Sequence, residues 1–255
     1  MILIGTSGWQ YDSWRGPFYP EDEPKRAWLN VYAHRFATVE VNNTFYRLPG
    51  DGTFEKWRAE SPDGFVFAVK ASRYITHLRR MRDAKDPVDL FWSGARRLGD
   101  RLGPVLFQFP PRFAADADRL EAFLAVLPQG LRPAFEFRDD SWARDDRVLA
   151  ALDRAGAAWV LVDRAGRVGP ELVCGGWSYV RFHQGGPVAP GYSRPALDRW
   201  ADRIAGLGVS EVWAFFNNDP QAAAPRDART MSKLLRERGL EVPGPAGEGA
   251  SDPSG

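Results

Sequence analysis

The chain has 255 residues, a formal net charge of +1, 26% charged residues and 44% hydrophobic residues. A net charge so close to zero excludes a global attraction to nucleic acid or to an anionic membrane, so any such partner must be recognised locally. Sixteen Phe and ten Trp favour a substantial hydrophobic core.

The cysteine count and the two ends of the sequence set further limits. The single cysteine, Cys174, excludes an intramolecular disulfide, and MILIG at the N-terminus is too short for a signal peptide or a membrane span. We therefore expect a cytoplasmic protein without a membrane partner, whose oligomeric state is unknown. Residues 243–255 contain nothing apolar enough to bury, which predicts a flexible tail after a single domain over residues 1–242.

Short apolar runs alternate with amphipathic segments along the chain. In chain order, the predicted strands are Ile2–Gly5, Thr38–Val41, Phe65–Lys70, Pro104–Phe109, Pro133–Phe137, Ala158–Asp163, Ser178–His183 and Glu211–Asn217. The amphipathic stretches between them, with apolar residues at intervals of three and four, include Pro24–His34, Asp116–Leu127, Arg144–Ala155 and Pro195–Leu207.

This alternation predicts an α/β fold, a (β/α)8 TIM barrel, because parallel strands joined by crossover helices need both faces of the sheet covered. The connection between the predicted sixth and seventh strands, RAGRVGPELVCGGW, holds too many glycines for a full helix. We expect that helix to be short or missing. An open doubly wound sheet is the alternative, but GTSGW after the first strand lacks the G-x-G-x-x-G spacing of a dinucleotide loop.

Polar residues recur where the predicted strands end. Strand side chains alternate faces, so Glu40 shares one side with Asn42 in VEVNN, Glu136 with Arg138, and Arg181 with His183. Further polar residues lie near the C-terminal ends of other predicted strands: Lys70, Gln108, Asp163 and Asn217. All of them should lie at the C-terminal end of the barrel, where barrel enzymes build their active sites.

The predicted site combines acids with permanent cations. Three acids (Glu40, Glu136, Asp163) should face three cations (Lys70, Arg138, Arg181), with His183 able to gain a proton near neutral pH. The pocket should then be roughly balanced in charge. We assign catalytic roles to Glu40, Glu136, His183 and Lys70, and substrate binding to Thr6, Ser7, Trp9, Asn42, Gln108, Arg138, Asp163, Arg181 and Asn217. A purely structural network of buried charges is the alternative.

Several blocks carry a family resemblance up to about Leu240: GTSGWQYDSWRGPFYP, EVNNTFYRLP, FVFAVKASRYITH, GPVLFQFPP, AFEFRDDSW, YVRFHQGG and FFNND. The chain resembles the domain of unknown function 72 family, also called YecE-like. The resemblance implies a TIM barrel distantly similar to the superfamily of xylose isomerases and endonuclease IV, with an unsettled function. It also implies polar strand-end positions at Glu40, Asn42, Lys70, Gln108, Glu136, Arg138, Arg181, His183 and Asn217. The chain departs from the family at Asp227-Ala228, where the family often has Asn-Ala.

The histidine inventory argues against a zinc cluster. The chain has three histidines: His34 on a predicted helix, His77 in the loop after the third strand, and His183. His34 is expected to be solvated or to cap its helix, whereas His77 could either enter the site or order its loop. We predict no cofactor, and the residues leave open a single Mg²⁺ held by carboxylates and substrate phosphate.

The cations favour an anionic ligand, because Arg binds phosphate or carboxylate bidentately. Gly185 and Gly186 follow the seventh strand, where barrels commonly bind phosphate. Among the loop aromatics, Trp9 is the predicted stacking residue, and an apolar cap is expected from Trp14, Phe18 and Tyr19.

The predicted function is an enzyme, a hydrolase or lyase, that acts on a phosphate-bearing substrate by carboxylate acid/base chemistry. Glu136 would be the general base or acid and Glu40 its partner. The ligand would be a small anion, such as a nucleotide, or a single-stranded nucleic acid. Two alternatives stay open: a nucleic-acid-binding module without chemistry, and a carbohydrate-active hydrolase that uses Glu40 and Glu136.

Overall fold

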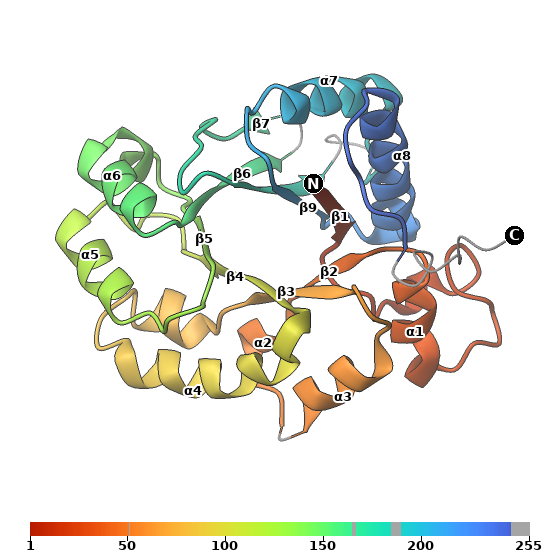
Figure 1. Ribbon diagram of the computed structural model, residues 1–255, viewed down its shortest axis with the longest axis horizontal. Coiled ribbons are helices and arrows are strands. Elements are labelled where there is room, and N and C mark those ends of the chain that lie inside the picture. The colour runs from red at the N-terminus through yellow and green to blue at the C-terminus, as the bar shows by residue number, and fades with distance from the viewer. Residues whose placement is uncertain (51, 165–166, 185–189, 246–255) are drawn as a thin grey trace, which may run out of the picture.

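A ring of strands is enclosed by helices (Figure 1). The computed structural model describes residues 1–50, 52–164, 167–184 and 190–245. Within these ranges, eight strands run parallel to their neighbours in the order β1-β9-β8-β6-β5-β4-β3-β2, an almost closed barrel. The predicted (β/α)8 TIM barrel is confirmed. The barrel strands are β1 Ile2–Thr6, β2 Thr38–Val41, β3 Val66–Lys70, β4 Leu102–Gln108, β5 Pro133–Glu136, β6 Ala158–Arg164, β8 Ser178–Gln184 and β9 Val212–Phe216.

Most helices cover the outside of the barrel, whereas the four-residue Asn43–Tyr46 helix lies at the end of the strands beside Lys70 (Figure 1). The helices are α1 Trp28–Ala33, α2 Asn43–Tyr46, α3 Thr53–Glu60, α4 Lys85–Ala95, α5 Ala117–Ala125, α6 Asp146–Arg154, α7 Arg194–Ala205 and α8 Ala223–Glu237. Side-chain caps mark the N-termini of several helices, because a short polar side chain accepts a hydrogen bond from a backbone N–H that has no partner within the helix. Asp116 caps α5, Asp145 caps α6 and Ser193 caps α7. Across the described ranges, no helix has the length and apolar character that crossing a membrane requires.

The connection between β6 and β8 lacks a helix over its described residues, as its glycines predict. Strand β7, Arg167–Val168, instead pairs antiparallel with the end of β6. Gly175 and Gly176 adopt positive φ angles of 65° and 75°, a conformation that glycine reaches without a steric penalty. A Cβ at Gly175 would also meet the backbone of Gly156 at 2.5 Å. The glycines therefore let this segment pack directly against the barrel.

Apolar residues fill both faces of the strands. One set points into the barrel, including Leu3, Ala68 and Leu106, and the alternating set packs under the helices. This double burial explains why the strands are nearly continuous apolar runs, since a parallel sheet is covered on both sides. Polar side chains replace the inner set mainly at the C-terminal ends of the strands, with Thr38 at the start of β2 as an exception, so the barrel has a largely apolar interior below a polar mouth.

The seam between β1 and β2 is closed by a side chain. The Tyr32 hydroxyl, from α1, accepts a hydrogen bond from the Thr6 N–H at 2.9 Å and donates to the Thr38 carbonyl at 3.1 Å. Two residues further along both segments, the Gly8 N–H donates to the Glu40 carbonyl at 2.8 Å. The Tyr32 hydroxyl thus replaces direct backbone hydrogen bonds between β1 and β2. This close approach requires glycine at position 5, because a Cβ there would lie 2.1 Å from the Thr38 carbonyl oxygen.

We expect Gly5→Ala to destabilise the protein by about 1–3 kcal/mol, because the added methyl forces the two strands apart in a close-packed core. Urea unfolding measures the change. Gly50→Ala is the matched control, since a Cβ there meets nothing within 4 Å, and it should stay within about 0.5 kcal/mol of the wild type. Equal stability of the two variants would contradict the close approach of β1 and β2.

Candidate functional site

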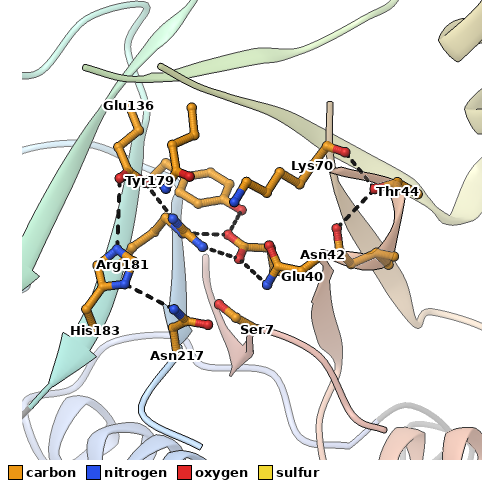
Figure 2. Close-up of polar contacts among 12 residues, drawn as sticks. Ser7, Glu40, Asn42, Thr44, Lys70, Glu136, Tyr179, Arg181, His183 and Asn217 are labelled. Atoms are coloured by element: carbon orange, nitrogen blue, oxygen red, sulfur yellow. Dashed lines mark hydrogen bonds and ion pairs between the residues drawn. The ribbon is translucent and has the colours of Figure 1, made fainter. Parts of the chain in front are cut away.

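One buried arginine joins two buried glutamates at the barrel mouth (Figure 2). Arg181 donates from Nε to Glu40 Oε2 at 2.9 Å, from Nη2 to Glu40 Oε1 at 2.7 Å, and from Nη1 to Glu136 Oε2 at 2.5 Å. The side chains of all three residues are at most 1% exposed. β2, β5 and β8 supply them, so the barrel brings together residues that lie far apart in the sequence.

Four further donors complete the shell of this network. Tyr179 donates to Glu40 Oε2 at 2.7 Å and Asn42 to Glu40 Oε1 at 3.2 Å. Gln108 and Arg138 donate to Glu136 Oε1 at 2.8 and 3.2 Å. Every carboxylate oxygen except Glu136 Oε2 thus accepts at least two hydrogen bonds, and that oxygen accepts from Arg181. Such saturation favours a structural role for both carboxylates over proton transfer.

Electrostatics keep the network ionised. Burial alone would raise the pKa of Glu40 and of Glu136, but the charge of Arg181 and the hydrogen bonds to it hold both pKa values below the ordinary range. Burial opposes the charge of Arg181 as well, and the two carboxylates outweigh it and raise the pKa of this guanidinium. The charged state is therefore the stable state of all three groups.

The surroundings of His183 favour its neutral form. Burial, with the positive charge of Arg181, lowers the pKa of His183 to about 3, so our prediction of a proton gained near neutral pH is wrong for the free protein. The ring nitrogen Nδ1 lies 3.0 Å from Asn217 Nδ2, an amide group that can only donate. Nδ1 therefore accepts, and the proton resides on Nε2, 3.9 Å from Glu136 Oε1.

We expect NMR to show His183 as the neutral Nε2–H tautomer from pH 7 down to about pH 4, because its pKa lies near 3. The His34→Gln and His77→Gln variants would assign the imidazole resonances, since the chain has three histidines. A His183 signal that titrates with the ordinary histidine pKa of 6.5 would show that the ring is better solvated than its burial indicates.

Lys70 is a partly desolvated amine at the end of β3. Its side chain is 7% exposed, and its Nζ lies 4.0 Å from the centroid of the Phe45 ring. Burial and the charge of Arg181 lower the pKa of Lys70 to about 8, although the two glutamates act in the opposite direction. The Thr44 hydroxyl fixes the backbone here by donating to the Lys70 carbonyl at 2.6 Å. An amine that titrates near neutral pH can exchange a proton with a substrate.

Three residues predicted in the site lie elsewhere. Asp163 faces the helices and accepts from Trp200 Nε1 at 2.6 Å, so its predicted place in the site is wrong. The Thr6 hydroxyl likewise points outward, where it donates to the Gly8 carbonyl at 2.7 Å. Trp9 is 3% exposed and packs edge-on against Trp57 at 5.5 Å, so it is a core residue and not an accessible stacking surface.

Reasoning from sequence missed Arg164, which follows Asp163 on β6. Its charge acts on Arg138, Glu136 and Arg181 at the mouth. The sequence offered a signal, because Val160 and Val162 belong to the inner apolar set and their alternation predicts an inner position for Arg164. The pairing of β6 with β8 shifts in register between Asp163 and Arg164.

Because Arg164 and not Asp163 lies at the mouth, the charge of the mouth differs from the predicted charge. The charged groups at the ends of the strands that act on one another are two carboxylates, Glu40 and Glu136, and four cations, Lys70, Arg138, Arg164 and Arg181. The mouth therefore carries an excess of two positive charges instead of the balance we predicted. A site with this excess attracts anions.

Three buried polar atoms around the network have no hydrogen-bond partner among the described residues: Ser7 Oγ, Asn42 Oδ1 and His183 Nε2. Ser7 and Asn42 both lie beside the Glu40 carboxylate (Figure 2). The Ser7 hydroxyl is close enough to help lower the pKa of Glu40, although not in the geometry of a full hydrogen bond. Buried polar atoms are normally satisfied, so a ligand or solvent is the expected partner of these three.

A cluster of divalent metals does not fit these residues. Within the described ranges, no group of three or more His, Cys, Asp or Glu side chains is arranged to hold a metal ion. Glu40 and Glu136, the carboxylates at the mouth, are already bound to Arg181. His34 lies away from the site, where its Nδ1 contacts the Asn30 carbonyl at 2.8 Å.

The remaining predictions concern loop residues and the C-terminus. Asp227 is 2% exposed and accepts from the Tyr192 N–H and from Asn218 Nδ2, both at 2.8 Å, so it orders the loops after β8 and β9. The predicted phosphate contacts at Gly185 and Gly186 lie outside the described residues, as does the predicted tail from 246 onward.

Comparisons with known proteins agree with this architecture. Residues 3–250 match the family described as protein of unknown function DUF72. The UPF0759 protein YunF of Bacillus subtilis (strain 168) is 33% identical over 277 residues, which span 92% of this chain and 95% of that protein. A DUF72 family protein from Thermotoga maritima MSB8 superposes with a TM-score of 0.81 at 28% identity, covering 92% of this chain and 99% of the other.

A DUF72 family protein from Enterococcus faecalis V583 superposes with a TM-score of 0.79 over 98% of this chain and 100% of its own. At 20% identity this similarity supports the fold alone. The family match, in contrast, covers nearly the whole chain. The protein described here belongs to the DUF72 family.

Proposed function

We propose that this protein is an enzyme that acts on a phosphate-bearing substrate at the mouth of the barrel, with Lys70 as the group that transfers a proton. The observation that carries the proposal is an excess of two positive charges at the mouth, Lys70 included, together with a pKa of about 8 for this lysine. The substrate class is a nucleotide or a single-stranded nucleic acid, and the reaction is a hydrolase or lyase reaction.

The groups at the mouth divide into a fixed floor and a binding set. Arg181 with Glu40 and Glu136 forms the floor, since all three are buried and mutually satisfied. Arg138, whose side chain is 28% exposed, and Lys70 can reach an anion above that floor. The Nε2–H of His183 adds a neutral donor to the same region. Arg supplies paired donors in the geometry that phosphate accepts.

The depressed pKa of Lys70 favours chemistry over binding alone. A lysine that only binds an anion gains nothing from desolvation, because the lost proton removes the charge that binds. A base or acid near neutral pH needs such a pKa. For this reason the module that binds nucleic acid without chemistry is the second candidate.

The carbohydrate-active alternative fits the geometry poorly. Glycoside hydrolysis places the scissile bond between two carboxyl groups. Here both carboxylates, Glu40 and Glu136, contact the same guanidinium of Arg181, which fills the space between them. A sugar would have to displace this buried arginine.

Calorimetric titration with AMP and with adenosine tests the proposal. AMP should bind and adenosine should not, because the phosphate supplies the charge that the mouth attracts. Arg138→Met should weaken AMP binding by about tenfold, the loss of one charge-assisted contact. Arg144→Met is the control, since Arg144 lies just beyond Arg138 in sequence with its side chain 78% exposed. Equal affinity for AMP and adenosine would refute phosphate recognition.

Turnover is a separate measurement. A panel of phosphorylated nucleotides and oligonucleotides, followed by phosphorus NMR, would reveal bond cleavage, and activity should rise with pH through the Lys70 pKa near 8 if the neutral amine is the base. Binding of AMP without turnover of any member of the panel would favour the binding module.

A further inference from the structure

A second basic feature lies beside the mouth, between the loop that follows β3 and helix α5. It is a groove of ≈ 550 Å³ whose lining includes His77, Arg79, Arg80, Arg82, Asp83 and Arg119. Four arginines and one aspartate give this groove an excess of three positive charges, whereas the whole chain carries +1. Positive charge is therefore concentrated here and not spread over the surface.

Two of these arginines are available for a ligand. Arg79 pairs with Asp83 at 3.6 Å, and Arg119 pairs with Asp116 at 2.8 Å. Arg80 and Arg82, in contrast, form no ion pair with any carboxylate in the described part of the chain. The Arg80 guanidinium lies over the Phe113 ring at 5.8 Å, a contact that does not neutralise its charge. Exposed cations that no carboxylate neutralises are the groups that bind phosphates of a nucleic acid backbone.

The loop that presents them has an unusual backbone. It starts with a π-helical turn, Tyr74–Leu78, and continues with positive φ angles of 49° at Arg80, 71° at Met81 and 44° at Asp83. Left-handed backbone is unfavourable for residues other than glycine and persists where the surroundings enforce it. Met81, 4% exposed in the core, anchors the loop from below. The arginines are thus held by a defined backbone.

The groove is linked to the mouth by two contacts of one aromatic ring. The Phe45 ring lies 4.0 Å from Lys70 Nζ on one side and 5.0 Å, edge to face, from the His77 ring on another. His77 in turn lines the groove. Tyr46, 73% exposed, contacts Phe45 edge to face at 5.0 Å, so an accessible aromatic ring adjoins this path.

We propose that the groove is a second anion subsite, and that the ligand is a single-stranded nucleic acid whose backbone runs from Lys70 past His77 toward Arg80 and Arg82 while a base stacks on Tyr46. A basic groove combined with an exposed aromatic ring is the usual platform for single strands. The inference rests on the proposed function and extends it, because one nucleotide cannot fill both the mouth and the groove.

Fluorescence anisotropy with a labelled oligothymidylate of about twelve nucleotides and with a dinucleotide tests the inference, the longer strand being expected to bind about tenfold more tightly. The Arg80→Glu/Arg82→Glu variant should lower the affinity for the longer strand about tenfold more than it lowers the affinity for AMP. The Arg96→Glu/Arg199→Glu variant makes the same charge change at exposed positions outside the groove and should leave the longer strand bound within about twofold of the wild type.

Tyr46→Ala distinguishes a nucleic acid from any other polyanion. It should lower the affinity for the longer strand about tenfold, by loss of base stacking, and leave the affinity for heparin within about twofold of the wild type. An equal loss for heparin, or equally tight binding of duplex DNA, would overturn the assignment to single strands. Equal affinities for the dinucleotide and the longer strand would overturn the second subsite while AMP binding still supported the mouth. Absence of AMP binding by the wild type would instead defeat the proposed function itself.

Discussion

Arg181→Met is expected to lower the free energy of unfolding at pH 7 by about 3–5 kcal/mol, the cost of leaving buried charges without their partner. Arg181 is the cation that contacts both Glu40 and Glu136, and both carboxylates are fully buried. Without it, burial would raise the pKa of each carboxyl above the ordinary range. Urea unfolding of the wild type and the variant gives the difference directly.

The pH dependence of this loss has a defined sign. In the wild type, the pKa values of Glu40 and Glu136 are lowered, so the network adds stability above their ordinary value of 4.5, and this stability is lost as the pH falls below it. In the variant, the carboxylates can protonate at higher pH and escape the cost of a buried charge. The two unfolding free energies should therefore converge on acidification.

Two further variants test whether unpaired buried charge causes the loss of stability in Arg181→Met. Arg132→Met removes an arginine that also pairs with a carboxylate, Glu211 at 2.8 Å, but whose side chain is 41% exposed, and it should cost at most about 1 kcal/mol. Adding Glu40→Gln and Glu136→Gln to Arg181→Met removes the buried negative charges and should recover part of the lost stability. A triple variant no more stable than Arg181→Met would show that unpaired charge is not the cause.

Lys70→Met is expected to act in opposite directions on stability and on binding. It should raise the unfolding free energy at pH 7 by about 1–3 kcal/mol, because a desolvated cation is replaced by an apolar chain of similar length. It should also weaken AMP binding by about a hundredfold, because the amine nearest the floor of the site is lost. Such a conflict between stability and function is typical of functional sites.

The gain in stability should depend on pH. The pKa of Lys70 falls from 10.5 to about 8 on folding, so the unfolded chain binds the proton more tightly and the charged lysine destabilises the protein below pH 8. This penalty decreases as the pH rises from 8 to 10.5, and the advantage of Lys70→Met should decrease with it. Lys56→Met, at a position with a 63% exposed side chain, is the control and should stay within about 0.5 kcal/mol. A destabilised Lys70→Met would contradict the desolvation of this amine.

The polar ends of the strands were readable from the sequence because alternation on a strand is local. In VEVNN the polar residues interrupt an apolar run, so Glu40 and Asn42 identify the inner face by themselves. On the sixth strand, apolar residues occupy both faces, with Leu161 under the helices and Val162 inside the barrel. The pattern there does not reveal which face is inner, and Asp163 was placed on the wrong one.

Interactions across the barrel were not readable in the same way. Glu40 and Arg181 are separated by 141 positions, and their contact exists only because the barrel closes. The pKa values of Lys70 and His183 follow from burial and from charges on other strands, which closure also decides. Trp9 belongs to a loop without any periodic pattern, so its packing against Trp57 depends on where helix α3 lies.

The sequence by itself determined the barrel, the lack of a helix over the described residues between β6 and β8, and the set of strands whose ends carry polar groups. Each of these depends on residues close together in the chain. Only the tertiary structure decided that two glutamates are neutralised by one arginine, that Arg164 takes the place of Asp163 at the mouth, and that a basic groove adjoins it. The physical reason is that charge, solvation and hydrogen bonding depend on distances in space, which a folded chain sets between residues distant in sequence.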